Sequence, residues 1–181
     1  DIYAHGGGTG GYITFAGFVK ETGRGVVVLT NSGSSNSDDI GIHLLDPQSP
    51  LQEVKPDYSY AIRQMIDKDG PAGLMEKYKT LKAENPGKYT LDEDAINTLG
   101  YAYLSQEKVE AAKAVFGINV MEFPNSSNAY DSYGEALMIQ GQKEEAIVYY
   151  QKSLELNPAN SNAVAMLAKM GVEVKQEEII V

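Results

Sequence analysis

A repeat of 34 residues in the second half of the chain constrains the fold more than any other sequence feature. Self-similarity at a fixed spacing of this size is typical of architectures in which one small structural unit stacks on the next. The recurring residues are two small positions, one aromatic position and one proline: Gly100 and Gly134, Ala112 and Ala146, Phe116 and Tyr150, and Pro124 and Pro158. The small residues let two helices approach closely, and the proline ends the second helix. The pattern therefore predicts stacked helical hairpins.

The spacing and the residue types resemble the tetratricopeptide repeat (TPR) family. The resemblance predicts a right-handed α-solenoid with regular repeats at residues 93–126 and 127–160. Residues 161–171 match only the first helix of a further repeat and are expected to cap the stack, because terminal repeats are often atypical. The expected fold class is mainly α, with about three helix pairs and a capping helix. Residues 172–181 form a tail to which no structure is assigned.

The segment at residues 55–88 is expected to be TPR-like but less regular. Tyr78 and Pro86 keep the spacing that the later repeats show. Ile62 and Leu74, however, stand where the pattern has a small glycine and a small alanine. We therefore expect a helix pair here that departs from a clean TPR.

The chain changes character near residue 55. Glycine and a valine-rich run dominate before this point, whereas alanine, glutamate and lysine at helical spacing follow it. Three prolines mark the boundary and favour an extended backbone: Pro47, Pro50 and Pro56. We expect an N-terminal segment at residues 1–45, a linker at 46–54 and a helical domain at 55–171.

The N-terminal segment has the pattern of a β-hairpin followed by a short helix. Residues 12–19 (YITFAGFV) and 25–30 (GVVVLT) are rich in β-branched and aromatic residues, and the charged turn between them contains Gly23. The second run is apolar on both sides, which predicts a strand buried on both faces of a sheet. The helix is expected at 39–45, before Pro47. An isolated hairpin is marginal in water and has open edges, so self-association through it is expected.

Residues 1–45 also resemble part of an enzyme family. The stretch HGGGTGGYITFAGFVKETGRGVVVLTNS is similar to the end of the catalytic domain in serine β-lactamases and related esterases and penicillin-recognising hydrolases. His5-Gly6-Gly7 falls at the third motif of that family, K-T-G or H-x-G. Tyr12 is the aromatic residue that follows a glycine pair, and Val28-Leu29-Thr30-Asn31 is the strand end. The resemblance implies that residues 1–45 are the remnant of an α/β hydrolase sheet. His in the place of Lys is more similar to the class C-related and esterase branch.

The resemblance implies part of a serine hydrolase site. In this family the residue just after the third motif donates a backbone N–H to the oxyanion hole, and here that residue is Gly8. His5 would lie beside the substrate carboxylate or assist proton transfer. The family's nucleophile motif S-x-x-K and its Y-x-N or S-x-N motif lie upstream of the third motif. The one S-x-x-K here, Ser105 to Lys108, falls after it in a turn between repeat helices, so the site is expected to be catalytically incomplete.

The helical domain offers a candidate peptide-binding groove. The first helices of successive repeats line the concave face of a solenoid. On the repeat spacing, this face carries one set of residues from each regular repeat: Asp94, Asn97, Tyr101 and Leu104, then Asn128, Asp131, Glu135 and Met138. No Lys or Arg is among them, so we expect the face to favour basic or neutral polar peptides over acidic ones. The alternative is that these acidic residues only solvate the helices.

Composition excludes several other classes of function. The 181 residues carry 15 Lys and Arg against 25 Asp and Glu, a net charge of −10 at pH 7, so neither nucleic acid nor an anionic membrane is an expected partner. Cys is absent and His occurs only twice, so no thiolate or His-rich metal site is expected. No apolar run reaches the roughly 20 residues of a membrane span. The glycine cluster precedes a strand rather than the helix that a dinucleotide site needs, so no cofactor is predicted.

Two functions remain open at this point. One is the C-terminal part of a serine β-lactamase-like hydrolase with an appended TPR interaction domain, in which the chain begins inside the hydrolase domain and lacks its nucleophile. The alternative is a free-standing TPR interaction or scaffold protein with no catalytic role. The hydrolase resemblance implies a periplasmic or extracellular location. The sequence specifies neither the substrate of a parent enzyme nor the peptide ligand.

Overall fold

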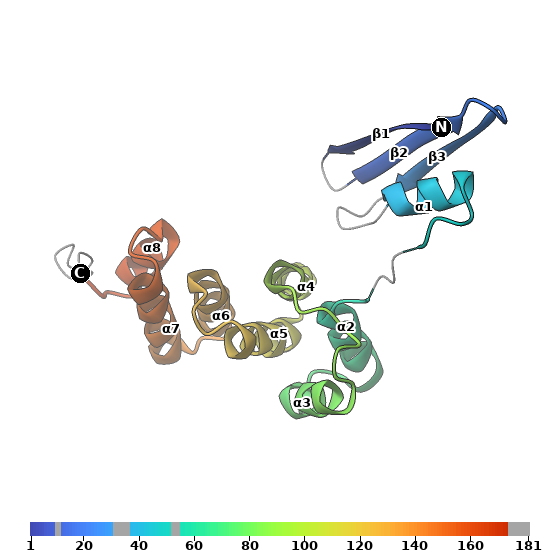
Figure 1. The fold of residues 1–181 in the computed structure, drawn as a ribbon. Helices are drawn as coiled ribbons and strands as arrows, with labels where there is room; N and C mark the ends of the chain where they lie inside the picture. The colour runs from blue at the N-terminus through green and yellow to red at the C-terminus, as the bar shows by residue number, and fades with distance from the viewer. Residues whose placement is uncertain (10–11, 31–36, 52–54, 174–181) are drawn as a thin grey trace. The chain divides into compact units, whose positions relative to one another are not determined.

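The chain divides into two compact units, Asp1–Val54 and Lys55–Val181 (Figure 1). The first unit is a small sheet with one helix, and the second is built from helices. Most of the tail predicted at 172–181 lies outside the part of the chain that the structure describes. The computed structural model describes residues 1–9, 12–30, 37–51 and 55–173.

The first unit contains a three-stranded antiparallel sheet in the order β1-β2-β3. Its strands are β1 (Ile2–Thr9), β2 (Tyr12–Val19) and β3 (Arg24–Thr30). The expectation of a two-stranded hairpin is corrected by a third strand, because residues Ile2–Thr9, with Gly6, Gly7 and Gly8 among them, pair with β2. Glycine has no side chain that could reveal a strand pattern, yet its backbone N–H and C=O groups pair as those of any other residue do.

Helix α1 (Ser37–Leu45) packs on one face of this sheet (Figure 1). The Phe15 side chain is only 2% exposed and lies against the helix at Gly41. A Cβ atom at Gly41 would come within 2.0 Å of the Phe15 ring, so only glycine allows the helix to lie this close. Residues that pair directly across antiparallel strands share a face. Gly6 and Val28, the partners of Phe15, therefore lie on the α1 side of the sheet.

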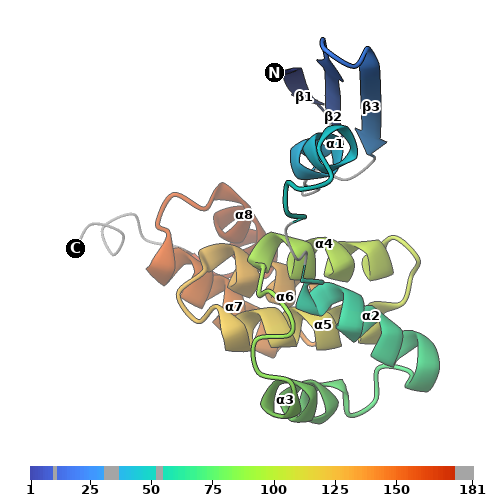
Figure 2. The ribbon, with the colours of Figure 1, turned by 45° about the vertical axis from the view of Figure 1, so that its right-hand side comes forward.

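Seven helices form the described part of the second unit: α2 (Tyr58–Asp69), α3 (Leu74–Glu84), α4 (Glu93–Leu104), α5 (Val109–Glu122), α6 (Ser127–Ile139), α7 (Lys143–Leu156) and α8 (Ser161–Lys169). From α4 onward each helix packs on the next (Figure 2). Four N-termini are capped by a short polar side chain that accepts a backbone N–H: those of Asp57, Asp92, Ser126 and Asn160. The prediction of a mainly helical fold is confirmed. None of the described helices is long and apolar enough to cross a membrane.

The segment 55–88, which the sequence predicts to be irregular, forms α2 and α3. These two helices contact each other less extensively than α4 and α5 do. Ile62 and Leu74 are both buried at positions where the regular repeats have a small residue. Their bulk between the helices accounts for the looser packing, because the distance between packed helices depends on the side chains at the contact.

A backbone bridge holds the start of α2. The Tyr58 N–H donates to the Thr90 carbonyl oxygen at 3.0 Å, and the Thr90 N–H donates to the Pro56 carbonyl oxygen at 3.0 Å. Thr90 lies shortly before α4, so the bridge connects the beginning of the first helix pair to the beginning of the second.

Candidate functional site

The residues predicted for the concave face lie on α4 and α6, the first helices of the two regular repeats. The Tyr101 hydroxyl on α4 donates to Glu135 Oε2 on α6 at 2.9 Å and lies 3.2 Å from Ser132 Oγ. Burial, the largest effect, raises the pKa of Tyr101 to about 12; the Ser132 hydrogen bond opposes this rise and the charge of Glu135 adds to it. Tyr101 is therefore protonated at neutral pH and can act as the donor that joins the two helices.

Asp131 is held at the junction between α6 and α8. Its side chain lies on α6 and the residue is only 9% exposed. Asn160 Nδ2 donates to Asp131 Oδ1 at 2.9 Å, and Asn162 Nδ2 donates to Asp131 Oδ2 at 2.7 Å. Asn160 is also the N-cap of α8 and donates to Ser153 Oγ at 2.8 Å. Two amides thus fix the orientation of this carboxylate and connect α8 to the repeat before it.

Asn160 and Asn162 were not predicted as part of this face, although the sequence contained the signal. Asn162 lies 34 residues after Asn128, and Asn160 lies 34 residues after the capping residue Ser126. Continuing the period into 161–171 places both of them at the edge of the face. The capping helix therefore contributes polar groups to the face as the regular repeats do.

The remaining predicted residues lie in different surroundings. Ser126 Oγ donates to Glu93 Oε1, and Asn128 Nδ2 lies 3.5 Å from the same oxygen. Asp94 is exposed. The Oδ1 atom of Asn97 is buried and has no hydrogen-bond partner among the described residues. The structure thus connects Asn128 to the network at the start of α4 and leaves Asp94 free to contact solvent.

Four carboxylates lie along this side of α4 and α6: Glu93, Asp94, Asp131 and Glu135. We call the surface that they form the acidic face. None of the ion pairs among the described residues includes any of the four. Glu93, Asp131 and Glu135 are instead bound by uncharged hydroxyl and amide donors. In the described part of the domain, no ion pair neutralises the negative charge of the acidic face.

The residues predicted for a hydrolase site lie in β1, an edge strand of the described sheet. His5 is exposed and pairs with Ala16, which places it on the face opposite α1. Gly8 pairs with Ile13 and, by alternation, lies on the other side of the strand. Within residues 1–9, 12–30 and 37–51, no hydrogen bond involves the His5 imidazole. The structure therefore does not bring these two residues onto one face of the strand.

The S-x-x-K match lies in the turn between α4 and α5, where the repeat pattern places it. The Ser105 hydroxyl donates to the Ala102 carbonyl oxygen at 2.9 Å. Lys108 Nζ donates to Gln106 Oε1 at 2.9 Å. Each polar group thus has a partner within the turn, and no hydrogen bond among the described residues joins Lys108 to Ser105.

Residues 127–160 match the tetratricopeptide repeat family model. These residues contain one tetratricopeptide repeat. The matched range is that of the second regular repeat, which comprises α6 and α7. A comparison with curated proteins found no match to the chain. The comparisons give no support to the hydrolase resemblance of residues 1–45.

Three solved structures are similar to the chain at low sequence identity. The second TPR domain of the human RPAP3 protein, in complex with the HSP70 peptide SGPTIEEVD, is 21% identical, with a TM-score of 0.43 and coverage of 63% of this chain and 92% of that one. The first TPR of Spaghetti (RPAP3), bound to the HSP90 peptide SRMEEVD, is 19% identical, with a TM-score of 0.44 and coverage of 66% and 96%. MamA is 18% identical, with a TM-score of 0.41 and coverage of 72% and 71%.

Proposed function

We propose that the TPR domain binds a peptide segment rich in Lys or Arg, and that this segment lies along the acidic face. The observation that supports the proposal is the row of four carboxylates that no ion pair among the described residues neutralises. A cationic side chain that reaches this face gains charge-assisted hydrogen bonds without displacing an existing ion pair. An acidic peptide meets like charge there and is disfavoured.

Asp131 and Glu135 are suited to act as fixed acceptors. Each oxygen of Asp131 already receives one amide hydrogen bond, and one oxygen of Glu135 receives the Tyr101 hydroxyl. An ionised carboxylate has about four lone-pair sites, so acceptor capacity remains for an ammonium or guanidinium group. Because these side chains are already oriented, binding costs less side-chain entropy than it does with mobile carboxylates.

Two labelled peptides of equal length test the proposal, one with Lys at alternate positions and one with Glu at the same positions. Fluorescence anisotropy should show that the Lys peptide binds and that its affinity falls as salt is added, because the attraction is screened. The Glu peptide and the acidic peptide SRMEEVD should not bind. Equal binding of the Lys and Glu peptides would contradict the proposal.

Matched charge variants locate the site. Asp94→Asn combined with Glu135→Gln removes two charges from the acidic face and should weaken binding of the Lys peptide by about tenfold or more. Asp131 is left unchanged because its carboxylate also holds α8 through Asn160 and Asn162, so its replacement would change stability as well as charge. Glu144→Gln combined with Glu145→Gln removes the same charge from the exposed first turn of α7 and should have little effect. Equal losses in both double variants would show a general charge effect instead of a site.

A second candidate function concerns the first unit. The placement of His5-Gly6-Gly7 on an edge strand, followed by β2, β3 and α1, favours the interpretation that residues 1–45 are the C-terminal part of a serine β-lactamase-like hydrolase. In that interpretation Gly8 supplies an oxyanion-hole N–H and His5 contacts the substrate, while the nucleophile lies elsewhere in a longer protein.

The hydrolase interpretation makes two checkable statements. The chain itself should not hydrolyse nitrocefin or p-nitrophenyl esters, because it carries no suitably placed nucleophile. Any longer protein that contains this chain should carry S-x-x-K and Y-x-N before Asp1. Turnover that Ser105→Ala abolishes would contradict the first statement, and a longer protein without these motifs would contradict the second.

A further inference from the structure

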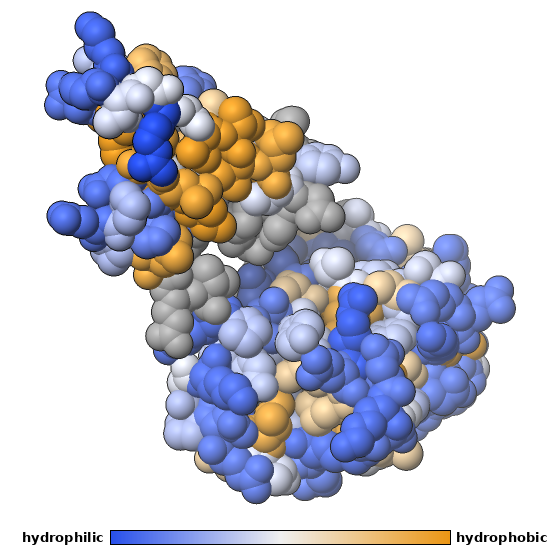
Figure 3. Space-filling view, turned by 90° about the vertical axis from the view of Figure 1, so that its right-hand side faces the viewer, coloured by the Kyte–Doolittle hydropathy of each residue, from blue (hydrophilic) through white to orange (hydrophobic). Residues whose placement is uncertain are grey.

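Among the described residues of the first unit, the face of the sheet opposite α1 is largely apolar, and no helix of that unit packs on it. Because Phe15 faces α1, the residues next to it in β2, together with their partners in β1 and β3, lie on the other side. We call this side the open sheet face, and its large side chains are Tyr3, Tyr12, Phe18, Val27 and Leu29. Figure 3 shows hydrophobic side chains gathered on the first unit. The expectation that β3 is buried on both faces is wrong in the described structure, since Val27 is 69% and Leu29 is 75% exposed.

The area of this face is large for a unit of this size. A large apolar or aromatic side chain presents roughly 150–250 Å² when fully exposed, so the five residues together leave on the order of 500 Å² in contact with water. The largest apolar patch on a typical monomer is about 300–600 Å² and often marks an interaction site. Two such faces in contact would bury on the order of 1,000 Å², the size at which specific protein interfaces begin.

The shape of the open sheet face suits contact with a copy of itself. Tyr3 and Phe18 stack with ring centroids 5.3 Å apart, so one end of the face is a fixed aromatic ridge. Ala16 lies at the centre, and a shallow depression around it is lined by Tyr3, His5, Phe18 and Val27. A ridge beside a depression on one surface is what a twofold contact needs, because each copy then supplies both halves of the fit.

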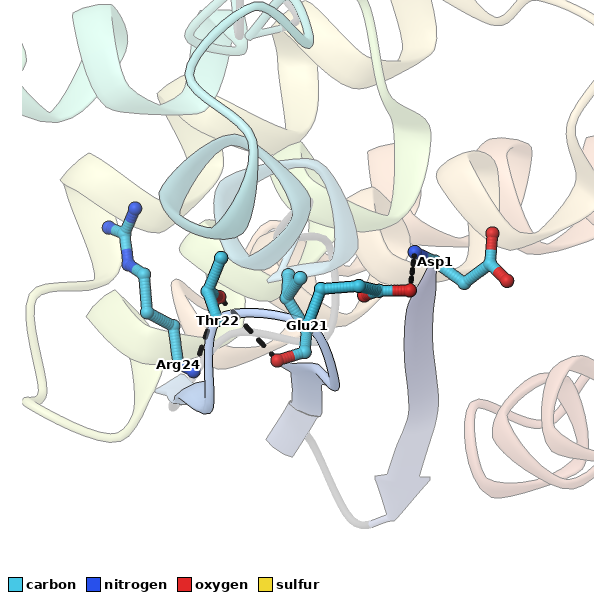
Figure 4. Close-up of polar contacts among 5 residues, drawn as sticks. Asp1, Glu21, Thr22 and Arg24 are labelled. Carbon is cyan, nitrogen blue, oxygen red and sulfur yellow. Dashed lines mark hydrogen bonds and ion pairs between the residues drawn. The ribbon is translucent and has the colours of Figure 1, made fainter.

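The charged groups of the described first unit lie at the end of the sheet where β2 turns into β3, and in or next to α1. At the turn between β2 and β3, the Asp1 amine donates to Glu21 Oε1 at 3.0 Å, and the Arg24 N–H donates to Thr22 Oγ1 at 3.4 Å (Figure 4). The Arg24 guanidinium donates to the Leu44 carbonyl oxygen at the end of α1 at 3.2 Å. The face is thus largely apolar, with His5 beside its centre and charges at one end, and protein interfaces likewise have an apolar core and a polar rim.

We propose that the chain forms a homodimer in which the open sheet faces of two copies pack against each other. The contact is between faces and not between strand edges, so the interface consists of side chains and does not require the backbones of the two copies to pair. Packed sheets lie about 10 Å apart, a separation that the exposed aromatic and aliphatic side chains of the two copies can fill. The proposal does not depend on peptide binding by the acidic face.

The oligomeric state of the full chain tests the proposal. Light scattering coupled to gel filtration, over a range of micromolar concentrations, should give the mass of a dimer for the wild-type chain. Val27→Lys combined with Leu29→Lys should give a monomer, because it places four charges in the interface. Val148→Lys changes a valine on α7 that is also largely exposed, at 61%, and should leave the dimer intact. Circular dichroism of each variant establishes that it is folded, since none of these side chains packs on α1.

A cross-linking measurement separates face contact from edge contact. The chain has no Cys, so Ala16→Cys introduces a single thiol at the centre of the open sheet face. A short bis-maleimide should link two copies, whereas a direct disulfide should form poorly because it needs Cα atoms about 4.4–6.8 Å apart. Val148→Cys should not cross-link.

A monomeric wild type overturns the proposal, whether the face is then covered by the TPR unit or by another protein. A dimer that persists in the Val27 and Leu29 double variant also overturns it, because the strand edges are then responsible.

Discussion

The two regular repeats follow one template but differ in how tightly their helices pack. In the first, a Cβ atom at Gly100 would come within 2.2 Å of the Phe116 ring. In the second, a Cβ atom at Gly134 would lie 3.3 Å from the Tyr150 ring, which is a tight contact but not an impossible one. The period predicts that both positions are small. It does not predict that Gly100 leaves no room for a Cβ atom, whereas Gly134 has nearly enough room for one.

The repeats also differ at a buried polar position, where Asn119 corresponds to Ser153. Ser153 Oγ donates to the Ser127 carbonyl oxygen and accepts from Asn160 Nδ2, each at 2.8 Å. Asn119 is fully buried, and neither its Oδ1 nor its Nδ2 atom has a hydrogen-bond partner among the described residues. One repeat thus uses this position to connect to the next helix, whereas the other buries an unpartnered amide. At this position the second repeat gains two hydrogen bonds, whereas the first repeat buries a polar group that forms none among the described residues.

The largest effect is expected at the first glycine. Gly100→Ala forces a methyl group into the Phe116 ring and should lower the free energy of unfolding by about 2–3 kcal/mol. Gly134→Ala should change it by less than about 1 kcal/mol, because the higher helix propensity of alanine offsets the tight contact with Tyr150. Urea denaturation of both variants measures the difference. Equal destabilisation would show that the two repeats pack alike.

A second substitution, at Phe116, tests whether contact with this ring causes the loss of stability in Gly100→Ala. Phe116→Leu removes the atoms that an added methyl group would meet, so the double variant with Gly100→Ala should lose less stability than the two single changes summed. Strict additivity would show that the cost of Gly100→Ala does not arise from contact with Phe116.

An intermediate effect is expected where the repeats differ in polar contacts. Ser153→Ala removes the two buried hydrogen bonds of Ser153 Oγ, one to the Ser127 carbonyl oxygen and one from Asn160 Nδ2, and leaves Asn160 Nδ2 with only its bond to Asp131. It should lower the free energy of unfolding by about 1–2 kcal/mol. Asn119→Leu replaces an unpartnered amide by an apolar group of similar size and should leave stability unchanged or raise it by about 1 kcal/mol. Thermal and urea unfolding check both. A large loss on Asn119→Leu would show that the amide has a partner in solution.

The smallest effect is expected at the contact between the two repeats. Tyr101→Phe removes the hydrogen bond to Glu135 and should lower the free energy of unfolding at pH 7 by about 0.5–1 kcal/mol. The folded-state pKa of about 12 lies above the ordinary value of 10, so the folded state holds the phenolic proton more tightly than the unfolded state. The contribution of Tyr101 is therefore complete below pH 10 and is lost as the pH rises toward 12. Urea unfolding at a series of pH values measures this. Between pH 9 and 12 the free energy of unfolding should decrease less with pH for Tyr101→Phe than for the wild type.

The helical part of the fold could be predicted because its pattern is local and periodic. Gly100, Ala112 and Phe116 each recur at one spacing, and this spacing fixes which helix faces which. Asp94, Asp131 and Glu135 of the acidic face follow from the same spacing, whereas Glu93 joins them through contacts that only the structure shows. Asn160 and Asn162 also lie on the period, once it is extended into the capping helix. The acidic character of the face is predictable from residue types, but the hydrogen bonds that orient Asp131 are visible only in the structure.

The first unit was harder to predict because its information is not periodic. Strand β1 is rich in glycine and carries no alternation of side chains, so only backbone pairing reveals it. The apolar run at Val26 to Leu29 indicates burial on both faces by sequence, yet α1 covers only one face. Hydrophobic residues indicate that a surface needs a partner but do not identify the partner, and this is why the open sheet face appears only in the structure.

The backbone bridge at the start of α2 has a mechanical consequence. The two hydrogen bonds between the Pro56–Tyr58 segment and Thr90 close residues 56–90 into a loop at its base. Tension applied to the chain before Pro56 therefore reaches the segment that leads into α4 without first stretching α2 and α3. The force therefore acts first on the two hydrogen bonds and on the repeats that begin with α4. Helices α2 and α3 are stretched only after both hydrogen bonds break.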